Sequence, residues 1–162
     1  MKKILVTLLA VFAVCSLYAQ IKIYRGWSSN DHDLIGSFYE GKLHQKDNVV
    51  ITIGNEKFYR GKHVNYYGIV ASFEHNKLYR GQSHLYRGNS TDRYNIIATF
   101  KDGKIYRGGS SSYDNIIAIY KDRKIYKGWS DRYEDVIITF SQEPSVELIF
   151  AVLFHYHRHL MP

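Results

Sequence analysis

A cation recurs before a glycine in a short motif along the whole chain. The motif reads Tyr-Arg-Gly, and Tyr-Lys-Gly in its last copy, and its cations are Arg25, Arg60, Arg80, Arg87, Arg107 and Lys127. Arginine can form paired hydrogen bonds to phosphate and carboxylate groups. If the fold brings these side chains to one rim, they would bind an anionic ligand. The alternative is that each cation pairs with a nearby aspartate or stacks on a neighbouring tyrosine.

Two tryptophans occupy the same position of the repeat, directly after the glycine of the motif. Trp27 belongs to the first copy and Trp129 to the last. An exposed indole offers a large contact area and a polar N–H, and it can therefore stack on a sugar ring. Trp27 and Trp129 are candidate sugar-binding residues. The alternative is that each one packs on a neighbouring hairpin.

Three histidines alternate near the C-terminus, at His155, His157 and His159. In a strand they would share one face, an arrangement that suits zinc or copper ligands. No carboxylate or fourth histidine lies beside them in the sequence. We therefore predict neither a metal site nor a cofactor.

Familiar catalytic motifs are missing from the sequence. It contains no Gly-x-Ser-x-Gly elbow, no His-Glu-x-x-His and no phosphate-binding loop. Most acidic residues occupy positions expected for turns and loops, where aspartate is favoured for backbone reasons. We predict a non-enzymatic protein without catalytic residues. The alternative is a secreted hydrolase with paired carboxylates at a rim.

Residues 1–19 have the layout of a secretory signal peptide. Lys2 and Lys3 precede an apolar stretch that is too short to span a bilayer comfortably, since about 20 residues are needed, and Ala19 offers a small residue before a cut. Cleavage there would remove Cys15, the only cysteine. We predict export to the periplasm or the extracellular space, with membrane contact only during export.

The balance of charge narrows the choice of partner. The chain has a net charge of +7 and contains 15 tyrosines, a composition that could suit nucleic acid or another polyanion. The basic residues recur evenly and alternate with acidic ones, which favours a mixed, solvated surface. We predict no nucleic acid partner and retain a glycan or an anionic envelope component as the candidate ligand.

A repeat of about twenty residues supplies the elements that must position these side chains. Full copies span 22–41, 57–76, 84–103, 104–123 and 124–143, with a worn copy at 42–56 and a shortened one at 77–83. Each copy contains two short strand candidates. Asp102-Gly103 favours a type I′ hairpin turn, which needs positive φ at both central residues. Asp122-Arg123 fits this turn less well, and we expect a looser connection there.

The strand candidates predict an all-β domain over residues 20–143. Five hairpins are expected, at 34–44, 49–61, 68–81, 96–108 and 116–128. The segments 21–25 and 136–140 are left over, and pairing them would close a ring and hide both sheet edges. Residues 144–162 form a tail that departs from the repeat. Its apolar run at 146–154 predicts a strand or a helix that covers the ring.

The Ile-Tyr-x-Gly strands, alternating with hairpins such as NIIATFKDGK, resemble the small secreted β-flower proteins. The resemblance covers roughly residues 21–143. It is to the five-fold β-flower proteins in particular, and more distantly to the four-fold β-flower domain. It implies a rosette of hairpins about an axis in exported bacterial proteins of uncharacterised function, with no catalytic residues. We therefore predict a binding or structural module of the cell envelope or secreted space.

Overall fold

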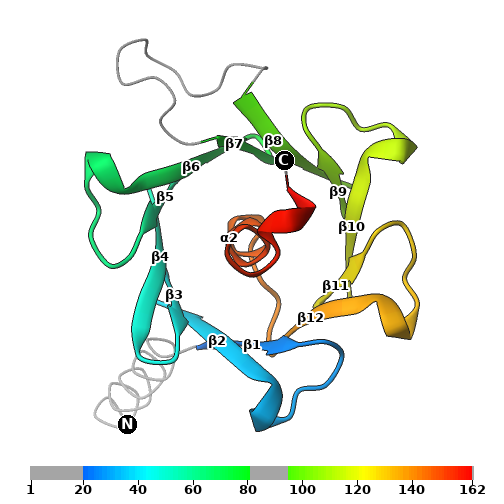
Figure 1. The fold of residues 1–162 in the computed structure, drawn as a ribbon, viewed down its shortest axis with the longest axis horizontal. Helices are drawn as coiled ribbons and strands as arrows, with labels where there is room; N and C mark the ends of the chain where they lie inside the picture. The colour runs from blue at the N-terminus through cyan, green and yellow to red at the C-terminus, as the bar shows by residue number, and fades with distance from the viewer. Residues whose placement is uncertain (1–19, 81–94, 162) are drawn as a thin grey trace, which may run out of the picture.

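The computed structural model describes residues 20–80 and 95–161 (Figure 1). In this part of the chain, twelve antiparallel strands form a closed barrel. The strands are β1 (Ile21–Arg25), β2 (Leu34–Tyr39), β3 (Lys42–Gln45), β4 (Asn48–Gly54), β5 (Lys57–Arg60), β6 (Ile69–Glu74), β7 (Lys77–Arg80), β8 (Ile96–Lys101), β9 (Lys104–Arg107), β10 (Ile116–Lys121), β11 (Lys124–Lys127) and β12 (Val136–Phe140). Among the turns that the structure describes in full, single 3-10 turns lead into β2, β6, β10 and β12: η1 (Asp31–Asp33), η2 (Tyr66–Gly68), η4 (Tyr113–Asn115) and η5 (Tyr133–Asp135).

The first and last strands close the barrel, as the sequence predicts. β1 pairs with β12 and places Ile23 opposite Phe140 and Arg25 opposite Ile138. The five expected hairpins form as β2–β3, β4–β5, β6–β7, β8–β9 and β10–β11. The pair of β12 with β1 acts as a sixth unit, so that six units surround the axis (Figure 1).

The hairpin turns follow one geometry, which includes the turn expected to be looser. Asp102 and Gly103 have φ of 51° and 72°, and Asp122 and Arg123 have φ of 51° and 61°. The prediction of a looser turn at Asp122-Arg123 is therefore wrong. The backbone carbonyl of Arg123 accepts a hydrogen bond from Phe140 N at 2.8 Å, and its guanidinium donates to the carbonyl of Ser141 at 2.9 Å. Both contacts favour the tight turn despite the cost of positive φ for arginine.

Strand alternation builds the central core from one residue of each motif strand. These residues are almost fully buried in one cluster: Ile23, Leu43, Phe58, Leu78, Ile105 and Ile125. The next residue along each strand points to the opposite face of the sheet. It is a buried tyrosine in five units and His44 in the sixth. The repeat thus conserves both an inner and an outer packing position.

The C-terminal tail fills the middle of the barrel. Helix α2 (Val146–Tyr156) begins at Ser145, whose side chain accepts a hydrogen bond from Leu148 N, and the 3-10 turn η6 (Arg158–Leu160) follows it. The residues from Leu148 to Leu153 are no more than 1% exposed. A helix that is apolar on all sides must be enclosed. Of the two expected forms the helix is the one observed, and it lies inside the ring of strands (Figure 1).

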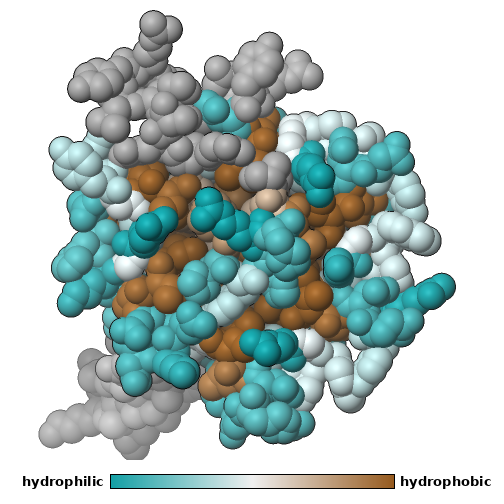
Figure 2. Space-filling view, viewed as in Figure 1, coloured by the Kyte–Doolittle hydropathy of each residue, from teal (hydrophilic) through white to brown (hydrophobic). Residues whose placement is uncertain are grey.

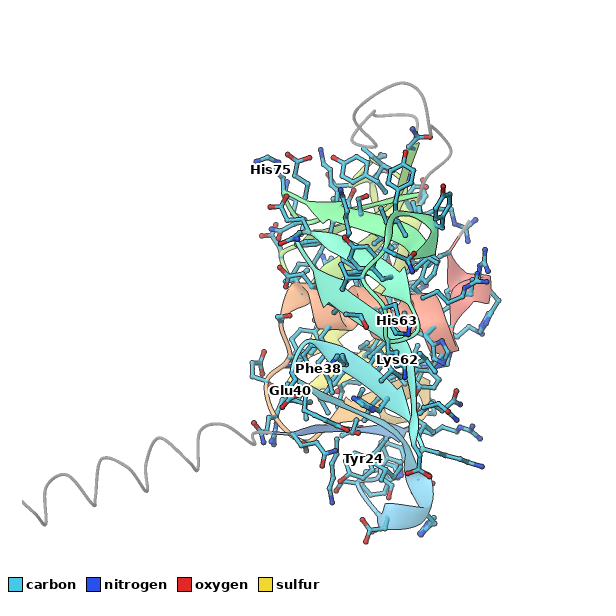
Figure 3. All side chains as sticks on the ribbon, turned by 90° about the vertical axis from the view of Figure 1, so that its left-hand side faces the viewer. Tyr24, Phe38, Glu40, Lys62, His63 and His75 are labelled. Carbon is cyan, nitrogen blue, oxygen red and sulfur yellow. The ribbon has the colours of Figure 1, made fainter. Side chains whose placement is uncertain are left out.

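The two ends of the barrel differ in what they carry. Figure 3 shows the hairpin-turn residues Glu40 and His75 at one edge of the ring, whereas Lys62 and His63, which follow the motif of β5, lie further toward the other edge. The C-terminal segment also lies at that other edge (Figure 3). No helix in the described part of the chain has the length and hydropathy needed to cross a membrane.

Candidate functional site

The recurring cations lie at equivalent places in the barrel. Strand pairing puts Arg60 opposite Ile51, Arg107 opposite Ala98 and Lys127 opposite Ala118. Residues directly opposite each other in an antiparallel pair share a face, and these three partners are buried in the core. The cations therefore continue the inward-facing rows at the end of each motif strand, where the barrel opens to solvent.

Arg25 completes this set, because it lies opposite the buried Ile138. Gln45 of β3 takes the same position in the unit that lacks the motif. Arg80 shares the register through Ala71, but its side chain lies outside the described part of the structure, and so does all of Arg87. The structure therefore brings Arg25, Arg60, Arg107 and Lys127 to one mouth of the barrel.

The C-terminal end of α2 adds further basic groups to this mouth. Arg158 and His155 line a pocket together with Arg60. Burial lowers the pKa of His157, and the nearby charges of His159, Arg25 and Lys127 lower it further. We refer to the cations Arg25, Arg60, Arg107, Lys127 and Arg158, together with the neighbouring imidazoles of His155 and His157, as the cationic mouth. Figure 2 views this face and shows hydrophilic residues over its middle, with apolar residues around them.

One pocket of the cationic mouth combines basic groups with an apolar wall. It has a volume of about 380 Å³. The wall consists of Val49, Val50, Ile51, Val70 and Phe154. The guanidinium of Arg158 lies over the ring of Phe154, 5.5 Å from its centre. His155 Nε2 lies 3.2 Å from Gln45 Oε1, and burial lowers the pKa of His155. This pocket can receive an anionic group at the end of a less polar moiety.

A second pocket of about 400 Å³ lies on the other side of the α2 terminus. Arg25, Lys46 and Tyr156 are among the residues that line it. The hydroxyl of Tyr156 donates to the carbonyl of Ile35 at 2.9 Å, and burial raises the pKa of this tyrosine to about 12. A β-carbon at Gly36 would collide with the Tyr156 hydroxyl. Gly36 thus leaves space for Tyr156 of α2. It lies in the β2–β3 unit, where Gln45 takes the position of the cation.

The cations of the mouth are not paired with carboxylates in the described structure. Ion pairs on the surface of the described part of the chain join Lys22 to Asp31, His32 to Asp33, His75 to Glu74 and Lys121 to Asp131. Within residues 20–80 and 95–161, none of these pairs includes Arg25, Arg60, Arg107, Lys127 or Arg158. The C-terminal end of α2 carries partial negative charge, which favours nearby cations by about 0.3–1 kcal/mol each. This interaction is weak and does not occupy the N–H groups of the cations, which can therefore donate hydrogen bonds to a ligand.

The two tryptophans do not meet each other, and each pairs with a tyrosine of its own unit. The rings of Trp27 and Tyr133 have centres 4.4 Å apart and are tilted by 55°. Trp129 and Tyr113 are 6.1 Å apart and tilted by 49°. Both tyrosines begin a 3-10 turn that leads into the first strand of the unit.

Tyr113 and Tyr133 are site candidates that the sequence reasoning missed. Their common position in the repeat, three residues before an Ile or Val strand start, was the available signal. Each contact joins the two loops that flank one pair of strands, and these loops belong to different copies of the repeat. Such contacts are compatible with the alternative role of packing on a neighbouring element.

A family comparison bears on this architecture. Residues 82–144 match the model of a family described as 6-fold beta flower protein. The match supports the resemblance to β-flower proteins, but to a six-fold family and not to the five-fold or four-fold members expected from the sequence. It spans less than half of the chain and agrees with the six units of the barrel. Searches of curated proteins and of solved structures returned no match.

The described residues form neither a group of metal ligands nor, in the two pockets, a pair of carboxylates for acid–base chemistry. In that part of the chain, no three His, Cys, Asp or Glu side chains are grouped closely enough to hold a metal ion. The rings of His157 and His159 meet in an edge-to-face arrangement with centres 5.7 Å apart, while His155 lies against Gln45. Asp33 is the one acidic residue that lines either described pocket. Paired carboxylates, which the hydrolase alternative requires, are not brought together in these pockets.

Proposed function

We propose that the protein is an exported, non-catalytic binding module, and that its ligand presents phosphate or carboxylate groups to the cationic mouth. The observation that carries this proposal is the convergence of basic side chains from four units and from the end of α2, without a carboxylate partner in the described structure. A concave surface lined by one sign of charge concentrates ions of the opposite sign. Envelope glycans and lipids with acidic groups fit this chemistry.

Two further features support the proposal. The leader-like layout of residues 1–19 favours delivery to the envelope or beyond, where such polymers occur. The pocket beside Arg60 has arginines but no acidic residue along its lining, a composition suited to holding an anion. Neither described pocket holds the pair of acidic groups that a hydrolase would use. Binding is therefore favoured over catalysis.

Titration calorimetry tests the proposal with two polyanions and a neutral polymer. The chain without residues 1–19 is titrated with inorganic polyphosphate, polygalacturonate and dextran at low and moderate salt. We expect binding of at least one polyanion, weakened by salt because counterions screen the charges, and no binding of dextran. Failure to bind either polyanion at low salt would refute the proposal.

A pair of double variants localises the site. Arg60→Ala with Arg107→Ala removes two mouth cations, and Lys57→Ala with Lys104→Ala removes two cations from the other ends of the same strands. A charged hydrogen bond contributes about 1.5–3 kcal/mol, so the first variant should bind at least about tenfold more weakly. The second should stay within about twofold. Equal losses in both would show a diffuse charge effect and contradict a site at the mouth.

A further inference from the structure

A second surface lies on the outside of the ring beside the cationic mouth, because Trp27 and Trp129 follow Arg25 and Lys127 by two residues. The loops that carry Trp27, Trp129 and the turns η4 and η5 project outward around the barrel (Figure 1). Strands β11 and β12 are paired, so the units that contain the two Trp–Tyr pairs are neighbours. The loop between these strands carries Trp129 at its start and Tyr133 near its end. It therefore links one aromatic pair to the other.

The fold does not require tryptophan at these places. The residue after the motif glycine is Lys62 in the unit of β5 and Gly109 in the unit of β9. Trp27 and Trp129 are 55% and 66% exposed, and Tyr113 and Tyr133 are more than half exposed as well. Large aromatic groups that remain in water contribute little burial energy to the core. Their presence on two adjacent units calls for a role other than packing.

The residues that neighbour the aromatic side chains in these loops are polar. The linking loop continues from Trp129 as Ser130, Asp131 and Arg132. Asp131 is anchored by Lys121 at 2.7 Å, and this bond lowers the pKa of the aspartate, which remains a charged acceptor. Beside Tyr113, the amide of Asn115 donates to Ser112 Oγ at 3.0 Å. Exposed aromatic faces on loops that also carry hydroxyl and carboxylate groups match a sugar chain better than an aliphatic partner.

We propose that the Trp27–Tyr133 and Trp129–Tyr113 pairs form a binding surface for an uncharged, β-linked gluco-configured oligosaccharide. The ring faces of such sugars carry C–H groups, which stack on indole and phenol rings, and their equatorial hydroxyls point sideways to polar neighbours. Adjacent units are two strands apart, or roughly 10 Å at the barrel wall. A ligand that contacts both pairs must therefore extend over more than one sugar ring. This site is independent of the anion site, since it uses other residues and a neutral ligand.

The protein carries its own reporter for this test, because Trp27 and Trp129 are its only tryptophans. Tryptophan emission is followed while cellohexaose or chitohexaose is added to the chain that lacks residues 1–19. We expect a saturable change in emission with at least one of the two oligosaccharides. If neither changes the emission, and calorimetry detects no binding of either, the proposal is overturned.

Variants then assign the binding to the two pairs. In calorimetry, Trp27→Ala and Trp129→Ala should each weaken binding about tenfold, and the double variant, which has no tryptophan left to report by emission, should show no binding. Tyr67→Ala is the matched control, because Tyr67 is an 88% exposed aromatic residue of another unit, and it should bind like the wild type. Trp27→Lys, which copies the slot of Lys62, replaces Trp27→Ala if the latter does not fold. Retained binding in the folded double variant would overturn the proposal, and so would equal loss in Tyr67→Ala.

Discussion

The enclosed helix provides a sharp test of the fold. The side chain of Phe150 is fully buried, and its ring lies 5.7 Å from the ring of Phe73 on β6. Removing a fully buried phenylalanine costs about 3–5 kcal/mol, because the transfer energy is lost and a cavity remains. A domain of this size has a total stability of about 5–15 kcal/mol. We therefore expect Phe150→Ala to lose a large part of the free energy of unfolding.

Phe154 offers a matched control one turn later on the same helix. It is only partly buried at the mouth, where it lines the pocket beside Arg60. Truncating it removes less area from contact with the core, and Phe154→Ala should cost about 1 kcal/mol. The difference in the free energy of unfolding between these two variants measures how fully the barrel encloses the helix at Phe150, since both change the same residue type in one helix.

Urea unfolding followed by far-ultraviolet circular dichroism supplies the measurement. The strands and the helix share one core, so we expect a single transition for both variants and a much lower midpoint for Phe150→Ala. Two results would refute the reasoning. One is a cost below about 1 kcal/mol for Phe150→Ala, and the other is a helix that unfolds in a separate, earlier transition, as expected for a segment lying on the outside.

Three further predictions concern stability and use the same urea assay. Gly36→Ala should cost about 1–3 kcal/mol by overpacking against Tyr156, whereas Gly54→Ala, at a site with open space around it, should cost less; equal costs would contradict the close approach. Ser145→Ala removes the cap of α2 and should cost about 1 kcal/mol, and an unchanged midpoint would mean that the cap is not used. Burial lowers the pKa of three histidines, His44, His155 and His157. The unfolded chain therefore binds protons first as the pH falls through about 6.5, so stability should decrease from about pH 7.5 to pH 5. A flat or rising midpoint over that range would contradict these shifts.

The hairpins and the closure of the ring could be predicted because their signals are local and repeated. The dipeptide Asp102-Gly103 predicts a tight turn, because aspartate and glycine are favoured where a type I′ turn needs positive φ. The segments 21–25 and 136–140 each lacked a partner, and only one pairing hides both edges. Counting six units instead of five required seeing that this pair, made from distant parts of the chain, is equivalent to the hairpins.

Other features were out of reach because they depend on tertiary context. A nine-residue apolar run fits a strand or a helix equally well, and the repeat gives no sign that its centre needs a filling element. The tight turn at Asp122-Arg123 depends on contacts with Phe140 and Ser141 from the next unit. The partners of the two tryptophans come from turns whose orientation the sequence does not specify. In each case the deciding neighbour lies outside the local window.

The pairing of β1 with β12 has a consequence for how the chain reaches its native state. The first strand pairs with the second on one side and with the twelfth on the other, and the helix that fills the centre follows the twelfth. Neither the β1–β12 pairing that closes the barrel nor its filled interior can form before residues 136–156 are available. A polypeptide delivered from its N-terminus would therefore remain open over most of its passage and become compact at the end. Such late completion of the fold would suit a protein that must pass through a narrow channel as an unfolded chain.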